Sequence, residues 1–282
     1  MSKWVNGGYA VFVLALALTL AGCNKDESKS DGAGGGGGAT ASSGPVTGTI
    51  HGKVTGEDGK PISAPGALVM VNISGVGAKS AERINYNAGV KPDGTYSQKL
   101  ADGSYHADAT LELNWNGKVY HISMQPVQNN RVDQESAAGI QQDFVWKLTG
   151  PRPNGNGTYG PNFHLLYEFY RNDLKKSVPP PPPGTKFVFT LTPKGPRIDG
   201  APAQPITFER TPDKLDDQKD IPAAIYTVTG TEVAPDGTKK PLVVRNPGLT
   251  NYADSCDVTF EPGSVLFNGY ENTTVDFSRK MN

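Results

Sequence analysis

The fold of this chain is decided by one stretch, Tyr105-His-Ala-Asp-Ala-Thr-Leu-Glu-Leu-Asn-Trp-Asn-Gly-Lys-Val-Tyr-His-Ile-Ser-Met124. Apolar residues alternate with polar ones along its first half, as in an antiparallel strand that buries one face. Asn116-Gly117 predicts a two-residue type I′ turn, because both central positions of that turn need a positive φ. The turn sets the register of the hairpin and places three pairs of residues opposite each other: Trp115 with Lys118, Leu113 with Tyr120, and Glu112 with His121.

The rest of the chain has the composition of an all-β protein. Its 282 residues include 34 glycines and 23 prolines, and long apolar patterns with a helical period are missing. Short alternating or apolar runs bounded by turn residues predict further strands at 48–55, 67–73, 140–148, 163–169, 186–192, 206–209, 221–233 (with a turn at Pro222), 240–245, 256–261 and 273–277.

The two halves of the chain have similar patterns. Each half has a strand, a buried strand, a turn and a long strand, and Lys60-Pro61-Ile62 is echoed by Lys240-Pro241-Leu242. We therefore expect two tandem antiparallel β-sandwich domains, at 48–148 and 163–282, joined by a linker at 149–162. Five consecutive prolines, 179–183, predict a stiff polyproline II spacer inside the second domain.

A family resemblance is carried by the first half. Gly52-Lys-Val-Thr-Gly-Glu-Asp-Gly-Lys-Pro-Ile62, Asp93-Gly-Thr-Tyr-Ser97 and Asp102-Gly-Ser-Tyr-His-Ala107 resemble the carboxypeptidase regulatory-like domain. The resemblance covers about residues 48–125 and implies a transthyretin-like (prealbumin-like) seven-stranded sandwich. In carboxypeptidases the catalytic residues sit in another domain, so the resemblance implies an accessory or structural module. The chain departs from the pattern by a long insert between Ser74 and Val90.

The N-terminus predicts export and a lipid anchor. Lys3 is followed by an apolar run that is too short to span a membrane and that fits a signal peptide, residues 1–22. Leu20-Ala21-Gly22-Cys23 resembles the lipobox of bacterial lipoproteins, which implies that Cys23 is acylated (palmitate) and becomes the first residue of the mature chain. An ordinary signal peptide with an incidental cysteine is the alternative.

A flexible tether is expected to follow the anchor. Residues 23–47 are rich in glycine and serine, and a coil of this length spans about 27 Å on average. By resemblance to the sorting rule of Gram-negative lipoproteins, Asn24 after the cysteine implies the outer membrane, on its periplasmic or its surface face. The membrane is therefore one expected partner, through the lipid on Cys23.

The net charge argues against nucleic acid as a partner, and the cysteine content bears on disulfides. The formal net charge is −1, and loss of Lys3 with the signal peptide leaves −2. A chain so near neutrality offers no electrostatic case for binding nucleic acid. With Cys23 assigned to lipid, Cys256 has no intrachain disulfide partner, and we interpret it as a small buried hydrophobe without a local base to activate it.

No catalytic motif or metal-ligand spacing is present, so we expect no enzyme activity, no cofactor and no metal. The four histidines (His51, His106, His121 and His164) are interpreted as residues on exposed sheet faces. The acidic run 213–220 is interpreted as a solvated loop, and calcium binding is the alternative. Large aromatics, Trp115, Trp146, Tyr120 and Tyr159, are expected in the core, although they could form a platform for a sugar ring.

The sequence therefore predicts a cell-envelope lipoprotein with a non-catalytic binding or scaffolding role toward an envelope protein. The alternative is a carbohydrate-binding, starch-binding-like surface module that uses aromatic residues. Candidate binding residues lie at the tip of the hairpin: Trp115, Tyr120 and His121.

Overall fold

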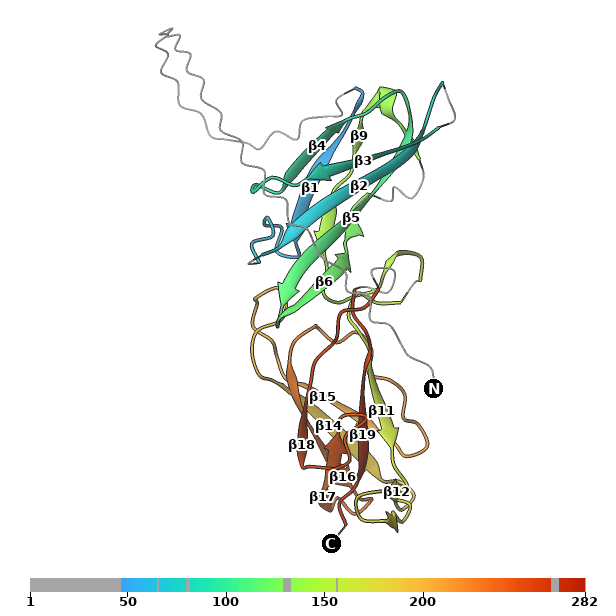
Figure 1. The fold of residues 1–282 in the computed structure, drawn as a ribbon. Helices are drawn as coiled ribbons and strands as arrows, with labels where there is room; N and C mark the ends of the chain where they lie inside the picture. Colours follow the sequence, from blue (N-terminus) through green and yellow to red (C-terminus); the bar gives the residue numbers. More distant parts are fainter. Residues whose placement is uncertain are drawn as a thin grey trace, which may run out of the picture. The chain divides into compact units, whose positions relative to one another are not determined.

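The computed structural model describes residues 47–64, 66–79, 82–128, 133–155, 157–264 and 269–281 (Figure 1). The predicted signal peptide, Cys23 and nearly all of the predicted tether lie outside these residues. The described chain is all-β, as predicted, with only two short 3-10 helices, η1 (Ser136–Ala138) and η2 (Pro153–Gly155). Among the described residues, none belongs to a helix of the length and apolarity that a membrane span requires.

One sheet of the first half is built around its first strand, β1 (Thr49–Gly56). This strand runs antiparallel to one neighbour and parallel to two others that come late in the half. The order is β4-β1-β10-β7, with β9 also on β1: β4 (Thr95–Lys99), β7 (Gln125–Pro126), β9 (Ile140–Gln141) and β10 (Phe144–Trp146).

The second sheet of the first half contains the hairpin formed by residues 105–124. Its order is β3-β2-β5-β6, with β8 paired to β5. The predicted register is confirmed, since Glu112 pairs with His121, Leu113 with Tyr120 and Trp115 with Lys118. The strands are β2 (Leu68–Gly77), β3 (Arg83–Gly89), β5 (Gly103–Trp115), β6 (Lys118–Ser123) and β8 (Gln134–Glu135).

The predicted insert between Ser74 and Val90 is corrected by this sheet. Residues on both sides of the gap at 80–81 continue the strand pair β2–β3, from Met70 opposite Gly89 to Val76 opposite Arg83. Ile84, Tyr86 and Ala88 alternate with polar residues, a strand pattern that the interpretation as an insert overlooked. Residues 83–89 form the edge strand of this sheet.

The turn of the hairpin offers a simple test. Asn116 and Gly117 have φ of 52° and 73°, as a type I′ turn requires. A Cβ at Gly117 would meet no atom within 4 Å, so the main cost expected for Gly117→Val is backbone strain at positive φ. We expect it to lower the free energy of unfolding by about 1–2 kcal/mol, measured by denaturant unfolding of the chain from residue 47 onward. Asn116→Gly, which keeps the allowed φ, is the control and should be near neutral; equal losses in both variants would contradict this explanation.

The second half forms a single hydrogen-bonded path of strands, in the order β11-β19-β17-β16-β14-β15, with β18 on β16. β17 joins its two parts, because its first residues pair with β16 and its last ones with β19. The strands are β11 (Phe163–Tyr167), β14 (Lys186–Pro193), β15 (Ile206–Arg210), β16 (Tyr226–Val233), β17 (Lys239–Arg245), β18 (Ser255–Val258) and β19 (Thr273–Arg279), and a separate pair is formed by β12 (Tyr170–Arg171) and β13 (Lys176–Ser177).

Aromatic side chains fill the core between the two parts of this path. The ring of Phe277 on β19 lies 5.2 Å from Phe187 and 4.9 Å from Phe189, both on β14, and 5.2 Å from Tyr167 on β11 (centroid distances). Phe187, Phe189 and Phe277 are fully buried. Contacts of this kind hold the second sandwich together without a disulfide.

The halves share one topological feature and differ in others. In each, the first strand runs parallel to the last one, β1 to β10 and β11 to β19. The echo of Lys60-Pro61-Ile62 is wrong as a structural match, since that segment follows a turn outside any strand whereas residues 240–242 lie in β17. The predicted strand 221–233 is also too long, because β16 begins only at Tyr226.

Candidate functional site

The three predicted binding residues at the hairpin tip have different surroundings. Tyr120 is fully buried, and its hydroxyl donates to the carbonyl oxygen of Phe260 at 2.8 Å. Its ring lies 5.7 Å from Trp115 and 5.9 Å from Tyr270. Burial, reinforced by the charge of Glu261, raises the pKa of Tyr120 to about 12. The prediction that Tyr120 contacts a ligand is therefore corrected: its surface is already covered by the second sandwich.

The tip of the hairpin and residues 260–264 and 269–270 form what we call the junction. Lys118 makes an ion pair with Glu261, and a Cβ at Gly269 would lie 2.3 Å from the carbonyl oxygen of His121, so the two backbones are in close contact. The described residues belong to one compact unit. The hairpin tip therefore joins the sandwiches, a role that no pattern in the sequence indicates because the partners are about 140 residues apart.

His121 and Trp115 remain partly accessible. His121 is exposed and its Nδ1 lies 3.7 Å from Glu112, the surface pair that the hairpin register predicts. His106 and His164 are likewise paired with acids, Asp133 at 2.7 Å and Asp217 at 2.5 Å. His51 differs, because both of its ring nitrogens are buried and make no hydrogen bond to the described residues.

The carboxylates of the acidic run point to separate partners. Asp216 faces Lys214, Asp217 faces His164, and Asp220 accepts hydrogen bonds from the backbone N–H groups of Gly150 (2.8 Å) and Gly160 (3.0 Å). Across the described ranges, no three His, Cys, Asp or Glu side chains converge as a metal site would require. The Asp220 carboxylate instead holds Gly150 and Gly160 to the second sandwich.

Cys256 lies on β18 against the core and is half-buried. Burial, together with the charges of Asp257 and Asp276, raises the pKa of its thiol to about 11. The thiolate needed for nucleophilic chemistry is therefore scarce near neutral pH.

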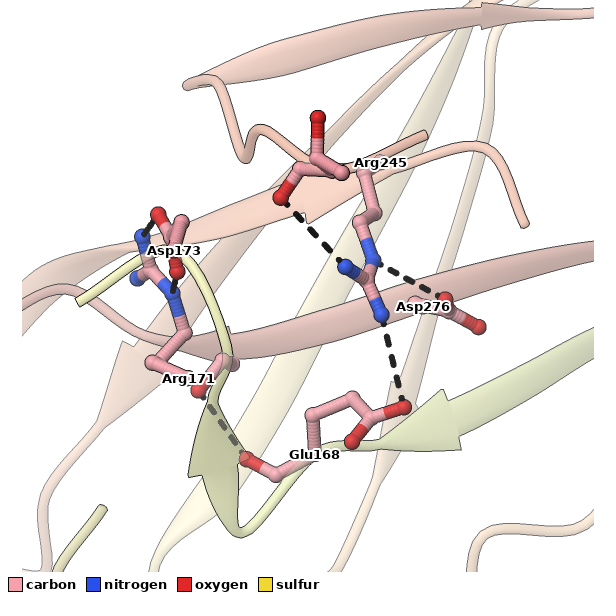
Figure 2. Close-up of polar contacts among 7 residues, drawn as sticks. Glu168, Arg171, Asp173, Arg245 and Asp276 are labelled. Atoms are coloured by element: carbon pink, nitrogen blue, oxygen red, sulfur yellow. Dashed lines mark hydrogen bonds and ion pairs between the residues drawn. The ribbon is translucent and has the colours of Figure 1, made fainter. Parts of the chain in front are cut away.

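A group of buried ionic contacts lies in the second sandwich, and we call it the arginine cluster: Arg171, Arg245 and Tyr252 with Glu168, Asp173 and Asp276. Figure 2 shows these residues except Tyr252. Arg171 and Arg245 place their guanidinium carbons 4.3 Å and 4.5 Å from the centre of the Tyr252 ring. Buried arginines are rare unless paired, and contact with an aromatic ring adds a cation–π attraction.

Arg245 connects three segments of the chain. Its Nε donates to Asp276 on β19 at 3.0 Å, its Nη2 lies 3.6 Å from Glu168 after β11, and its Nη1 donates to the carbonyl oxygen of Thr250 at 3.5 Å (Figure 2). Only 11% of the Arg245 side chain and 7% of the Asp276 side chain are exposed. The Arg245 guanidinium, which is largely removed from water, therefore holds together the segments that contain Asp276, Glu168 and Thr250.

Arg171 stabilises the short β12–β13 hairpin. Its guanidinium binds Asp173 through both oxygens, at 2.7 Å and 2.5 Å, and these bonds lower the pKa of Asp173. Arg197 and Asp199 repeat the same Arg-x-Asp arrangement elsewhere in this sandwich. Tyr252 has its hydroxyl buried without a hydrogen-bond partner in the described chain, and burial raises its pKa to about 12.

Large apolar side chains are exposed around the arginine cluster. Each lies within three residues along the chain of a cluster member or of Thr250, and the exposures are 42–63%. We call this set the apolar face: Leu166, Phe169, Tyr170, Leu174 and Leu249. It is the strongest candidate for a functional site, and it was missed because a sequence pattern cannot tell an exposed Phe169 from a buried one.

No family model matches the sequence, and no curated protein matches it. One of the solved structures that match is the Bacillus anthracis TIE protein (9% identity, TM-score 0.37, 82% of this chain and 34% of that one). A second is a C-terminal fragment of the pilus adhesin SpaC from Lactobacillus rhamnosus GG (12% identity, TM-score 0.26, 82% of this chain and 96% of that one). A third is a DUF3823 family protein from Bacteroides ovatus (12% identity, TM-score 0.20, 76% of this chain and 99% of that one). The chain spans about a third of the length of the TIE protein. With TM-scores below 0.5, these matches carry no conclusion about this chain.

Proposed function

We propose that this chain is a non-catalytic lipoprotein of the cell envelope that binds a partner protein through the apolar face. The observation that carries the proposal is the exposure of five large apolar side chains, each within three residues along the chain of the arginine cluster or of Thr250: Leu166, Phe169, Tyr170, Leu174 and Leu249. Single exposed apolar side chains on soluble proteins need no explanation, whereas several near one cluster suggest an interaction surface. Aromatic side chains on a preorganised support contribute most to such interfaces.

The buried ion pairs of the arginine cluster support a binding role for the apolar face. Arg171 and Arg245 hold the β12–β13 hairpin and the loop at 246–254 in one arrangement, so little conformational entropy is lost when a partner docks. The raised pKa of Cys256 supports a non-catalytic role for this thiol. The resemblance of residues 48–125 to carboxypeptidase regulatory-like domains agrees with an accessory module.

Site-specific photo-crosslinking in cells tests the apolar face. A photoreactive amino acid at Tyr170 should give one discrete adduct with a partner protein, whereas the same group at Asn87, exposed on β3, should give none. Adding Phe169→Ser and Leu174→Ser should remove the adduct, because the burial of both side chains at an interface contributes several kcal/mol. A diffuse pattern, or an adduct that survives both changes in a protein that still melts cooperatively, would contradict the proposed binding face.

The anchor is tested separately. Several acyl chains on Cys23 would hold the protein on a bilayer, at about 0.8 kcal/mol per buried methylene. Cys23→Ser should therefore move the protein from the membrane to the soluble fraction or stall it as the precursor, as read by fractionation and gel mobility. Recovery of the wild-type protein in the inner membrane alone would overturn the outer-membrane assignment and leave the anchor standing.

A carbohydrate-binding role is the second candidate, and Phe169 and Tyr170 are the observation that favours it. These residues are 63% and 45% exposed, whereas Tyr120 at the hairpin tip is covered, so a sugar ring has more aromatic surface to stack on here. Titration with soluble polysaccharides distinguishes the candidates. Saturable binding that Tyr170→Ala abolishes would favour the glycan role over the protein partner.

A further inference from the structure

The five prolines at 179–183 connect β13 to β14 and lie mostly on the surface. Each of the first four is followed by another proline, which restricts all of them to the extended polyproline II conformation. Burial along the segment follows the three-residue period of that helix. Val178 is buried and Pro181 is half-buried, whereas Pro179, Pro180, Pro182 and Pro183 are exposed.

The segment is held in place along its length. Nη1 of Arg279 donates to the carbonyl oxygens of Pro179 (3.1 Å) and Pro180 (3.5 Å), and Nε of Arg279 binds the buried Glu232 at 2.6 Å. At its start, the N–H of Val178 donates to the carbonyl oxygen of Phe169 at 2.8 Å. At its end, the N–H of Thr185 donates to the carbonyl oxygen of Pro182 at 3.1 Å across a turn in which Gly184 has φ 84°.

These contacts leave two parallel ridges free. Residues three apart align on a polyproline II helix, so one ridge is formed by Pro179 and Pro182 and the other by Pro180 and Pro183. Grooves lined with aromatic side chains bind such ridges, and a segment that is rigid before binding loses little entropy. A segment that only connected two strands would need neither exposed proline ridges nor the hydrogen bonds from Arg279.

Positive charge lies immediately before the ridges. Lys175 and Lys176 are both exposed, and neither has an acidic partner within 4.0 Å among the described residues. A groove that accepted the prolines with acidic residues at its rim would be complementary to them.

We propose that Pro179–Pro183 is a docking ligand for a partner domain that has an aromatic-lined, polyproline II-binding groove with an acidic rim. This site uses none of the side chains of the apolar face, and the inference does not depend on the function proposed for that face.

The probe is a purified SH3 domain whose groove carries a tryptophan and an acidic rim. The titrated protein is the mature chain with Cys23→Ser, and the groove tryptophan fluorescence reports binding. Saturable binding is expected. Pro179→Ala with Pro182→Ala should weaken it about tenfold or more, since one ridge is lost. Lys175→Glu with Lys176→Glu should weaken it and remove most of its salt dependence.

Controls separate this inference from the proposed function and from misfolding. The Phe169→Ser, Leu174→Ser variant should bind the SH3 probe like the parent protein, and the proline variant should keep the adduct formed at Tyr170. Melting curves must show that each variant is folded; where the alanine variant is not, Pro183→Glu places a charge on the second ridge instead. Absence of saturable binding by the parent protein, or equal binding by a folded proline variant, overturns the inference.

Discussion

Arg245→Met is expected to lower the free energy of unfolding by about 3–5 kcal/mol, as found when one partner of a buried ion pair is removed. Methionine keeps much of the side-chain volume but leaves the Asp276 carboxylate, only 7% exposed, without its cation. The variant also loses the bonds to Glu168 and Thr250 and the contact with Tyr252. Chemical denaturation of the chain from residue 47 onward measures the loss.

Two further variants define the cause. Arg83→Ala removes an exposed arginine from β3 and should change stability by less than about 0.5 kcal/mol. Adding Asp276→Asn to Arg245→Met should recover part of the loss, because the uncompensated charge disappears. A loss below about 1 kcal/mol for Arg245→Met would mean that the arginine cluster behaves like a surface ion pair.

Gly52→Ala is the second large expected effect, about 3 kcal/mol or more, at the upper end of overpacking losses. A Cβ at Gly52 would lie 1.8 Å from the carbonyl oxygen of Gln142, which is backbone and cannot rotate away. That carbonyl also accepts a hydrogen bond from the buried hydroxyl of Tyr96 at 2.6 Å. Between β9 and β10 the chain therefore comes so close to β1 that only glycine fits.

Gly89→Ala is the matched control, because Gly89 is also in a strand of the first sandwich and a Cβ there would meet nothing within 4 Å. It should be neutral or slightly stabilising. Thermal melting of both variants provides the comparison. Equal behaviour of the two would show that β1 can move away from Gln142 without loss, contrary to the close packing described.

Local chemistry was enough to predict most of the longer strands and the hairpin. Asn116-Gly117 and the alternation along β5 depend only on nearby residues, and both the register and the positive φ values followed correctly. At β3 the alternation of Ile84, Tyr86 and Ala88 was present but was interpreted as part of an insert. β16 begins later than the predicted strand, because the segment that contains Asp220 and Pro222 binds Gly150 and Gly160.

The candidate site was predicted poorly for a physical reason. Trp115 and Tyr120 looked like an accessible platform at a hairpin tip, but the partners that cover Tyr120 are Phe260 and Tyr270, far along the chain. Phe169 looked like the end of a buried strand, but the chain turns into the β12–β13 hairpin and exposes both Phe169 and Tyr170.

The sequence by itself determined the all-β class, the hairpin and its register, because turn chemistry and alternation act over a few residues. Only the tertiary structure decided which aromatics are covered, which arginines are buried and where apolar side chains gather. Those properties depend on contacts such as Arg245 with Asp276 and Tyr120 with Phe260, between residues 31 and 140 positions apart. Burial is a property of the neighbours that folding brings together, and a linear pattern holds no record of them.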